Sequence, residues 1–265
     1  MVKVILQCIL ILLPTAVSVF YPLQKIVYVF LSLLTIDTTN LDNVIKSITS
    51  NEKTISIICG IILSVFFYFW RKRANTEKLF NTGDSYNNYP IWIYWIAGKI
   101  LGYGKLTLVR VPIYLQYKLL LADVFPNILV DSDIENKEQA VIVLEKNMEQ
   151  PFDELNLILM DTYEITEDQI PLNKINLPTV IIQKGNDFEG HRIFNPEFVK
   201  VIREKTNLYS RTFKQVNIFS TTNTNHNNAI ISKCFKIGNR TGFKNILVHQ
   251  ANRENYTFTE EHRVL

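Results

Sequence analysis

VNIFSTTNTNHNNAI, residues 216–230, changes abruptly from an apolar run into small polar residues. Val216, Ile218 and Phe219 are typical of a buried strand, and the nine residues that follow, 220–228, are all Ser, Thr, Asn or His. Apolar residues then return at helical spacing. The stretch therefore predicts a strand, a polar loop and a helix, in that order.

The region around this stretch, residues 105–265, alternates between strand and helix signals. Asn195-Pro196-Glu197 has the pattern of a helix start, and Gly238 that of a helix end. Short, nearly continuous apolar runs suit strands that are buried on both faces of a largely parallel sheet. Such runs are KLTLVRVPI from Lys105, LNLILMDTY from Leu155, TVIIQKG from Thr179 and NILVHQ from Asn245. We therefore predict a cytoplasmic α/β Rossmann-like domain with a mainly parallel sheet over residues 105–265.

The polar loop is a candidate ligand site, because ligands of open parallel sheets bind outside the carboxyl ends of the strands. Free N–H groups and the helix dipole at the following helix start favour an anion such as phosphate. The alternative is a loop that only caps the helix and turns the chain. The predicted ligand-binding residues of this loop are Thr221, Thr222, Asn223, Asn225, His226 and Asn227.

Other strand ends add cationic, aromatic and amide side chains that suit a nucleotide. Each of them singly could be a solvated turn residue. The further predicted ligand-binding residues are Thr162, Tyr163, Lys184, Arg192, Gln250, Arg253 and, for reaching the ligand charge, Arg110. Asp161, His191, His249 and Asn252 lie at the same strand ends.

Motifs of common catalytic sites are missing from the sequence, which contains no GxGxxG, GxxxxGK[ST], GxSxG or HExxH. Asp161 and His226 could form an acid/base pair with a threonine, so a nucleotide hydrolase stays an alternative. The three cysteines have no metal-ligand spacing, and a net charge of +3 does not suggest duplex nucleic acid. We predict no catalytic residue, no metal and no cofactor.

The N-terminal part, residues 1–70, is much more apolar than the rest. Residues 4–24 carry no charge, the run resumes from 26 to 36, and a second uncharged run covers 54–70. Because about 17 to 20 apolar residues can cross a bilayer, both runs predict membrane helices that form a two-helix transmembrane hairpin. Pro14 and Pro22 predict a kink or break in the first run. A cleaved signal peptide over residues 1–20 is the alternative.

The hairpin is followed by a predicted juxtamembrane linker, residues 71–104. It begins with Arg71-Lys72-Arg73, and the positive-inside bias places this end in the cytoplasm. Within the apolar runs the polar groups are Lys25 and the hydroxyls of Ser18, Ser32, Ser56 and Ser64. Spans with so little charge predict a weakly polar pore or disruption of the bilayer rather than a selective transporter.

The order NIFSTTNTNHNNAIISKCFKIG…NILVHQANRENYTF resembles the closing strand–helix–strand of the SAVED and CARF cyclic-oligonucleotide sensors. The resemblance covers about residues 216–258, and the rest of 105–265 in outline. With two membrane helices, the chain resembles the membrane effectors of CBASS-like anti-phage systems in bacteria. This resemblance implies an inner-membrane, homo-oligomeric effector that senses a cyclic or linear oligonucleotide messenger and permeabilises the lipid bilayer. It also implies a separately encoded nucleotidyltransferase that makes the messenger. An NAD-derived messenger and a structural interaction module without a ligand are the alternatives.

The two apolar runs and the basic cluster after them predict that both chain ends lie in the cytoplasm. A reporter that is active only in the periplasm should be active when fused at Asp42 and silent when fused at Leu265. Activity of the fusion at Leu265 would contradict the predicted topology.

Overall fold

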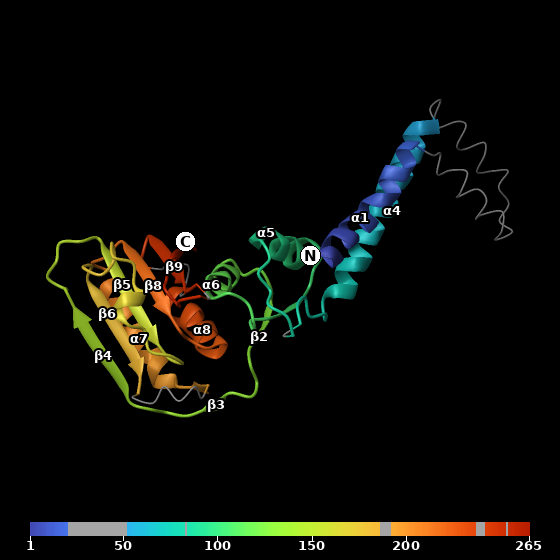
Figure 1. The fold of residues 1–265 in the computed structure, drawn as a ribbon. Helices are drawn as coiled ribbons and strands as arrows, with labels where there is room; N and C mark the ends of the chain where they lie inside the picture. Colours follow the sequence, from blue (N-terminus) through green and yellow to red (C-terminus); the bar gives the residue numbers. More distant parts are fainter. Residues whose placement is uncertain (21–51, 83, 186–191, 237–241, 253) are drawn as a thin grey trace. The chain divides into compact units, whose positions relative to one another are not determined.

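The computed structural model describes residues 1–20, 52–82, 84–185, 192–236, 242–252 and 254–265 (Figure 1). The chain divides into two compact units. One consists of Met1–Lys78 and Trp95–Gly104, and the other of Leu79–Tyr94 and Lys105–Leu265. Each unit is described by itself, and the domain boundaries at residues 70 and 104 stay predictions.

A six-stranded sheet forms the centre of the second unit, in the order β10-β9-β8-β5-β6-β4. The four central strands are parallel, whereas β10 and β4 pair antiparallel at the two edges. The expectation of a mainly parallel sheet is therefore confirmed, with antiparallel edges added. The strands are β4 (Val141–Lys146), β5 (Glu154–Met160), β6 (Thr179–Lys184), β8 (Gln215–Ser220), β9 (Asn245–Gln250) and β10 (Glu260–Arg263).

The chain reverses its direction of travel across the sheet at β5. It moves from β5 to the neighbouring β6, then crosses back over β5 to β8 and continues to β9. The ends of β5 and β8 thus form a topological switch point, where a crevice is expected. The connection from β5 to β6 contains the 3-10 helix η2 (Glu167–Gln169) and no α-helix, so the Rossmann-like description stays a prediction.

Both faces of the central strands are buried, which explains their continuous apolar sequences. Helices α6 (Ile113–Leu121), α7 (Pro196–Tyr209) and α8 (Thr224–Ile230) pack together, and α6 and α7 also contact the sheet. A second apolar cluster combines strand residues such as Ile158 and Phe219 with Phe258 from beyond β9. The predicted helix start is confirmed, because the Asn195 side chain accepts a hydrogen bond from the Glu197 N–H. Gly238 lies outside the described residues.

The prediction of a long core strand from Lys105 to Ile113 is wrong. β1 (Lys105–Thr107) pairs with β2 (Asn127–Leu129) in a separate two-stranded sheet. Arg110 turns the chain with a φ of 57°, and Pro112 then caps α6, so the strand cannot continue. A second small sheet joins β3 (Glu135–Asn136) to β7 (Ile193–Phe194).

The first unit contains the long helices α1 (Val2–Phe20) and α4 (Glu52–Asn75), which pack against each other. Among the described helices, α1 is the one with the length and apolar composition to cross a membrane. It runs through Pro14 without ending there. The predicted break between Tyr21 and Lys25 lies outside the described residues.

Hydroxyl groups line the contact surface between α1 and α4, which we call the seam. Thr15 and Ser64 are hydrogen-bonded at 2.7 Å, and the Ser56 hydroxyl donates to the Ser18 carbonyl at 3.1 Å. Ser18, Ser56 and Ser64 are buried, and the weakly polar pore stays a prediction. Ser32 lies outside the described residues.

Gly60 allows the two helices to approach at this seam. A Cβ atom at position 60 would lie 2.3 Å from Ser18 Oγ and 2.9 Å from the Pro14 carbonyl oxygen. We expect Gly60→Leu to separate the helices, and to abolish a disulfide crosslink between cysteines placed at positions 15 and 64 of a chain lacking its native cysteines. Ile62→Leu on the exposed face of α4 is the control and should leave the crosslink intact.

Candidate functional site

A cavity of about 500 Å³ lies at the switch point between β5 and β8. It brings together six of the predicted ligand-binding residues from four separate parts of the sequence. These are Arg110, Thr162, Tyr163, Arg192, Thr222 and Asn223. The remaining lining residues are Tyr86, Val109, Asp131 and Thr224.

Asn223 at the end of the polar loop caps α8. Its side-chain oxygen accepts hydrogen bonds from the N–H groups of Asn225 at 3.0 Å and His226 at 2.9 Å. The backbone donors that were expected to receive a phosphate are therefore already occupied by the cap. The cationic side chains that line this cavity are those of Arg110 and Arg192.

Most hydroxyls and amides of the loop are hydrogen-bonded within the loop or to other parts of the protein. The Thr222 hydroxyl contacts Ser220 Oγ and donates to Asn227 Oδ1, and the Asn227 amide donates to Gln116 Oε1 at 3.0 Å. Asn225 donates to the Asp131 carbonyl oxygen at 3.0 Å. The many small polar residues thus attach the start of α8 to α6 and to neighbouring loops.

Asp161, His226 and Lys184 form a buried cluster behind the cavity. The Asp161 carboxylate lies 2.6 Å from His226 Nδ1 and 3.0 Å from Lys184 Nζ, and accepts a 2.9 Å hydrogen bond from the Asn223 N–H. The Asn195 N–H donates to His226 Nε2 at 2.8 Å. Nε2 is therefore the unprotonated nitrogen of a neutral imidazole, and Nδ1–H donates to the carboxylate.

This cluster is a structural element rather than an acid/base pair for a ligand. The side chains of Asp161 and His226 are 0% exposed, and both ring nitrogens of His226 are already hydrogen-bonded. Burial alone would raise the pKa of the Asp161 carboxyl. The hydrogen bonds from His226 and Asn223, together with Lys184, outweigh that effect and hold the pKa below its usual value.

The other predicted residues lie in different surroundings. Thr221 lines a second cavity together with Tyr163, and its hydroxyl donates to the Tyr163 carbonyl oxygen at 2.8 Å. Gln250 lines a third cavity, which it shares with Tyr86. Lys184, His226 and Asn227 are buried and hold the loop from behind. Arg253 and His191 lie outside the described residues.

His249, the other histidine at these strand ends, is buried and stacks on Phe219 with ring centroids 4.3 Å apart. Burial, with smaller effects of Lys174 and His262, lowers the pKa of His249 to about 4. The imidazole is therefore neutral at physiological pH and packs as an aromatic ring of the core.

Sequence reasoning missed Tyr86, Asp131 and Thr224 as cavity residues. Tyr86 lies in the segment 79–94 of the second unit, within the predicted linker 71–104. Its aromatic and Asn-rich neighbourhood, SYNNY, was the available signal. Thr224 lay inside the polar loop, whereas Asp131 follows the short β2 and has no comparable signal.

The family described as SUa-2TM, SMODS- and Ubiquitin system-associated 2TM effector domain, matches residues 1–265. The chain belongs to the SUa-2TM family. Of the described helices, α1 has the length and apolar composition to cross a membrane, and the two-helix hairpin stays a prediction. A comparison with curated proteins finds no match.

Among solved structures, this SUa-2TM chain is similar to Acinetobacter baumannii Cap4, a SAVED/CARF-domain containing receptor. The Cap4 structure with the cyclic trinucleotide 3'3'3'-cAAA shows 13% identity and a TM-score of 0.42. The structure with 2'3'3'-cAAA shows 15% identity and a TM-score of 0.43. Each match covers 64% of this chain and 41% of Cap4, so the chain spans about two fifths of that receptor.

Asp161→Asn should destabilise the second unit strongly, because it leaves the Lys184 ammonium buried without a counter-charge. We expect a loss on the order of 3–5 kcal/mol in chemical denaturation followed by tryptophan fluorescence. The matched control is Asp153→Asn, which breaks an exposed 2.6 Å ion pair with Lys214 and should cost less than about 1 kcal/mol.

The stability difference between the wild type and Asp161→Asn should also depend on pH. Since the folded-state pKa of Asp161 is lowered, its contribution is complete above the ordinary carboxyl pKa of about 3.9 and is lost as the pH falls through the folded pKa. The stability difference between wild type and Asp161→Asn should therefore shrink below about pH 4. A stability difference that stays constant as the pH falls below about 4 would contradict the lowered pKa of Asp161.

Proposed function

We propose that this SUa-2TM protein is a membrane effector of antiviral defence whose second unit senses a nucleotide messenger. The cavity at the ends of β5 and β8 carries the proposal, because it combines two arginines with two tyrosines at a topological switch point. The description of the family as a 2TM effector supports the membrane part of the proposal.

The chemistry of the cavity suits an anionic ligand that also has aromatic or hydroxyl groups. Guanidinium groups bind phosphate oxygens with two parallel hydrogen bonds, and tyrosine rings stack on bases. The Arg110 side chain donates to the Asp84 carbonyl oxygen, so its position is already restrained. Asp131 can accept hydrogen bonds from ribose hydroxyls or from amino groups of a base.

A cyclic or linear oligonucleotide is the leading ligand class, and an NAD-derived nucleotide is the second. The messenger would come from a separately encoded nucleotidyltransferase. A nucleotide hydrolase finds no support in the Asp161–His226 pair, since His226 has no free ring nitrogen. A structural module without a ligand would leave the arginine-containing cavity without a role.

We further propose that both ends of the chain are cytoplasmic and that ligand binding changes the association of protomers in the inner membrane. Two helices cannot enclose a pore, so permeabilisation requires several copies. The outward side chains of α1 are apolar and exposed, and the seam hydroxyls face α4. This arrangement favours disruption of the bilayer over a pore lined by the seam hydroxyls. The Rossmann-like description of the second unit belongs to the same proposal.

Binding should be measured by calorimetry with the full chain in detergent micelles. Panels of cyclic oligonucleotides, linear oligonucleotides and NAD-derived nucleotides should yield at least one ligand. Arg192→Ala should then weaken binding of that ligand at least ten-fold, because a charge-assisted contact is lost. Arg211→Ala, which removes an exposed arginine outside the cavity, should leave the affinity unchanged.

The membrane response can be tested with the same proteins in dye-loaded liposomes. Ligand-dependent leakage of the wild type, reduced by Arg192→Ala in line with its affinity, is the expected result. Absence of binding to every nucleotide, or leakage independent of ligand, would rule out the proposed sensor.

A further inference from the structure

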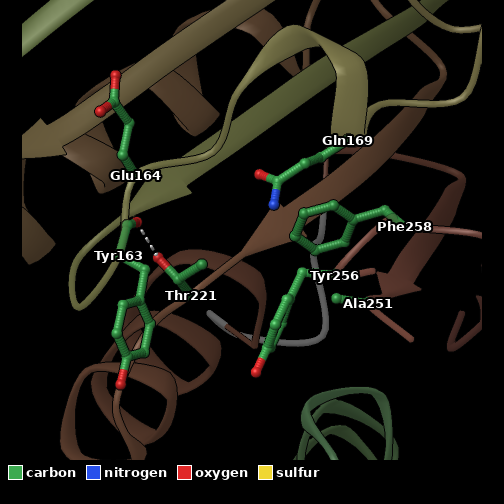
Figure 2. A pocket seen from close by; sticks show the side chains of 7 residues that line it. All are labelled: Tyr163, Glu164, Gln169, Thr221, Ala251, Tyr256 and Phe258. Atoms are coloured by element: carbon green, nitrogen blue, oxygen red, sulfur yellow. Dashed lines mark hydrogen bonds between the residues drawn. The ribbon is translucent and has the colours of Figure 1, made fainter. Parts of the chain in front are cut away.

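We propose that the second cavity at the carboxyl edge of the sheet is a nucleobase subsite, next to the arginine-lined cavity. The cavity has a volume of about 440 Å³ and is drawn in Figure 2. This inference rests on the proposed function and adds that the ligand must carry an aromatic base. The lining residues are Tyr163, Glu164, Gln169, Thr221, Ala251, Tyr256 and Phe258.

Three of the seven lining residues are aromatic. Tyr163 and Tyr256 extend from opposite sides of Thr221, and Phe258 closes the upper right of the view in Figure 2. Both tyrosines are 66% exposed, whereas Phe258 is 3% exposed. The rings of the two tyrosines are therefore open to water, whereas Phe258 forms a buried apolar part of the wall. A flat heteroaromatic base can cover such faces by stacking.

The backbone turn that carries Tyr256 is restrained. Tyr256 has a φ of 57°, a conformation that is unfavourable for a bulky side chain. The surrounding turn is held by Asn252 and Asn255, whose side-chain oxygens accept from the N–H groups of Asn255 and Thr257. Strained residues of this kind persist where the neighbouring structure enforces them.

Gln169 provides a hydrogen-bonding group next to the rings. Its side-chain oxygen accepts from the Thr166 N–H at 3.0 Å, so the oxygen end of the amide is used within the protein. The Nε2 end points from η2 toward the space between Phe258 and Thr221 (Figure 2). An amide N–H₂ group can donate to the ring nitrogens or carbonyl oxygens of a base.

The two cavities are adjacent, as the base and the phosphate of a nucleotide are. Tyr163 lines both cavities, and the adjacent residues Thr221 and Thr222 line one each. A base beside Tyr163 and Tyr256 therefore places its sugar and phosphate toward Arg110 and Arg192. This arrangement predicts poor binding of anions without a base, such as inorganic polyphosphate.

Saturation-transfer NMR can test the base subsite with the full chain in detergent micelles. The probes are the four linear diribonucleotides pApA, pGpG, pCpC and pUpU, together with tripolyphosphate. For at least one diribonucleotide, saturation of the base protons should exceed that of the ribose H4' and H5' protons. Tyr256→Leu should lower the base signal at least three-fold, Tyr256→Phe should retain it, and tripolyphosphate should not compete.

Two further variants separate the subsite from general effects. Gln169→Glu keeps the oxygen that accepts from Thr166 but removes the donor, so we expect weaker diribonucleotide binding at an unchanged melting temperature. Phe152→Leu, an exposed aromatic residue before the amino end of β5, is the control and should change nothing.

The outcomes distinguish the subsite from the proposed function. Diribonucleotide binding that is sensitive to Arg192→Ala but unaffected by Tyr256→Leu would overturn the base subsite and leave the nucleotide sensor intact. No binding of any of the four diribonucleotides would overturn the base subsite as defined here. Binding of tripolyphosphate as strong as that of every diribonucleotide would also overturn it.

Discussion

The buried contact between Asp161, His226 and Lys184 is the constraint on which the architecture of the second unit depends. Asp161 follows β5, Lys184 ends β6, and His226 lies in the first turn of α8, so one carboxylate connects three elements. A buried charge is tolerated only when it is paired and hydrogen-bonded, and here it has a cation, an imidazole and a backbone N–H. Because these partners fix the start of α8, they also fix Thr222 and Asn223 at the cavity wall.

This constraint explains why the polar loop has two different roles. The side chains of Asn223, Asn227 and Thr222 are directed into the protein, where each has a partner. The other cavity residues come from segments far apart in the sequence, and in the proposed function they supply most of the ligand contacts. The cavity therefore combines a hydrogen-bonded loop, whose side chains are fixed, with more exposed arginine and tyrosine side chains. Binding residues on loops that a rigid scaffold positions are common in proteins.

The sequence allowed the central strands to be predicted because β5, β6, β8 and β9 are continuously apolar. It did not reveal β10, whose residues Glu260–Arg263 are polar because an edge strand needs no apolar side chains. The run after Lys105 was mistaken for a core strand, since apolar composition alone does not show the turn at Arg110. For the site, strand-end reasoning found six cavity residues. It could not find Tyr86, whose position depends on long-range folding of residues 79–94.

The division of the chain into two units has a mechanical consequence. The backbone passes from one unit to the other after Lys78, again after Tyr94 and a third time after Gly104. Three passages of the backbone connect the two units at three points rather than one. The segment between the first two passages carries Tyr86, a wall of the arginine-lined cavity. The chain on both sides of Tyr86 therefore leads into the first unit, through Lys78 in one direction and through Trp95 in the other.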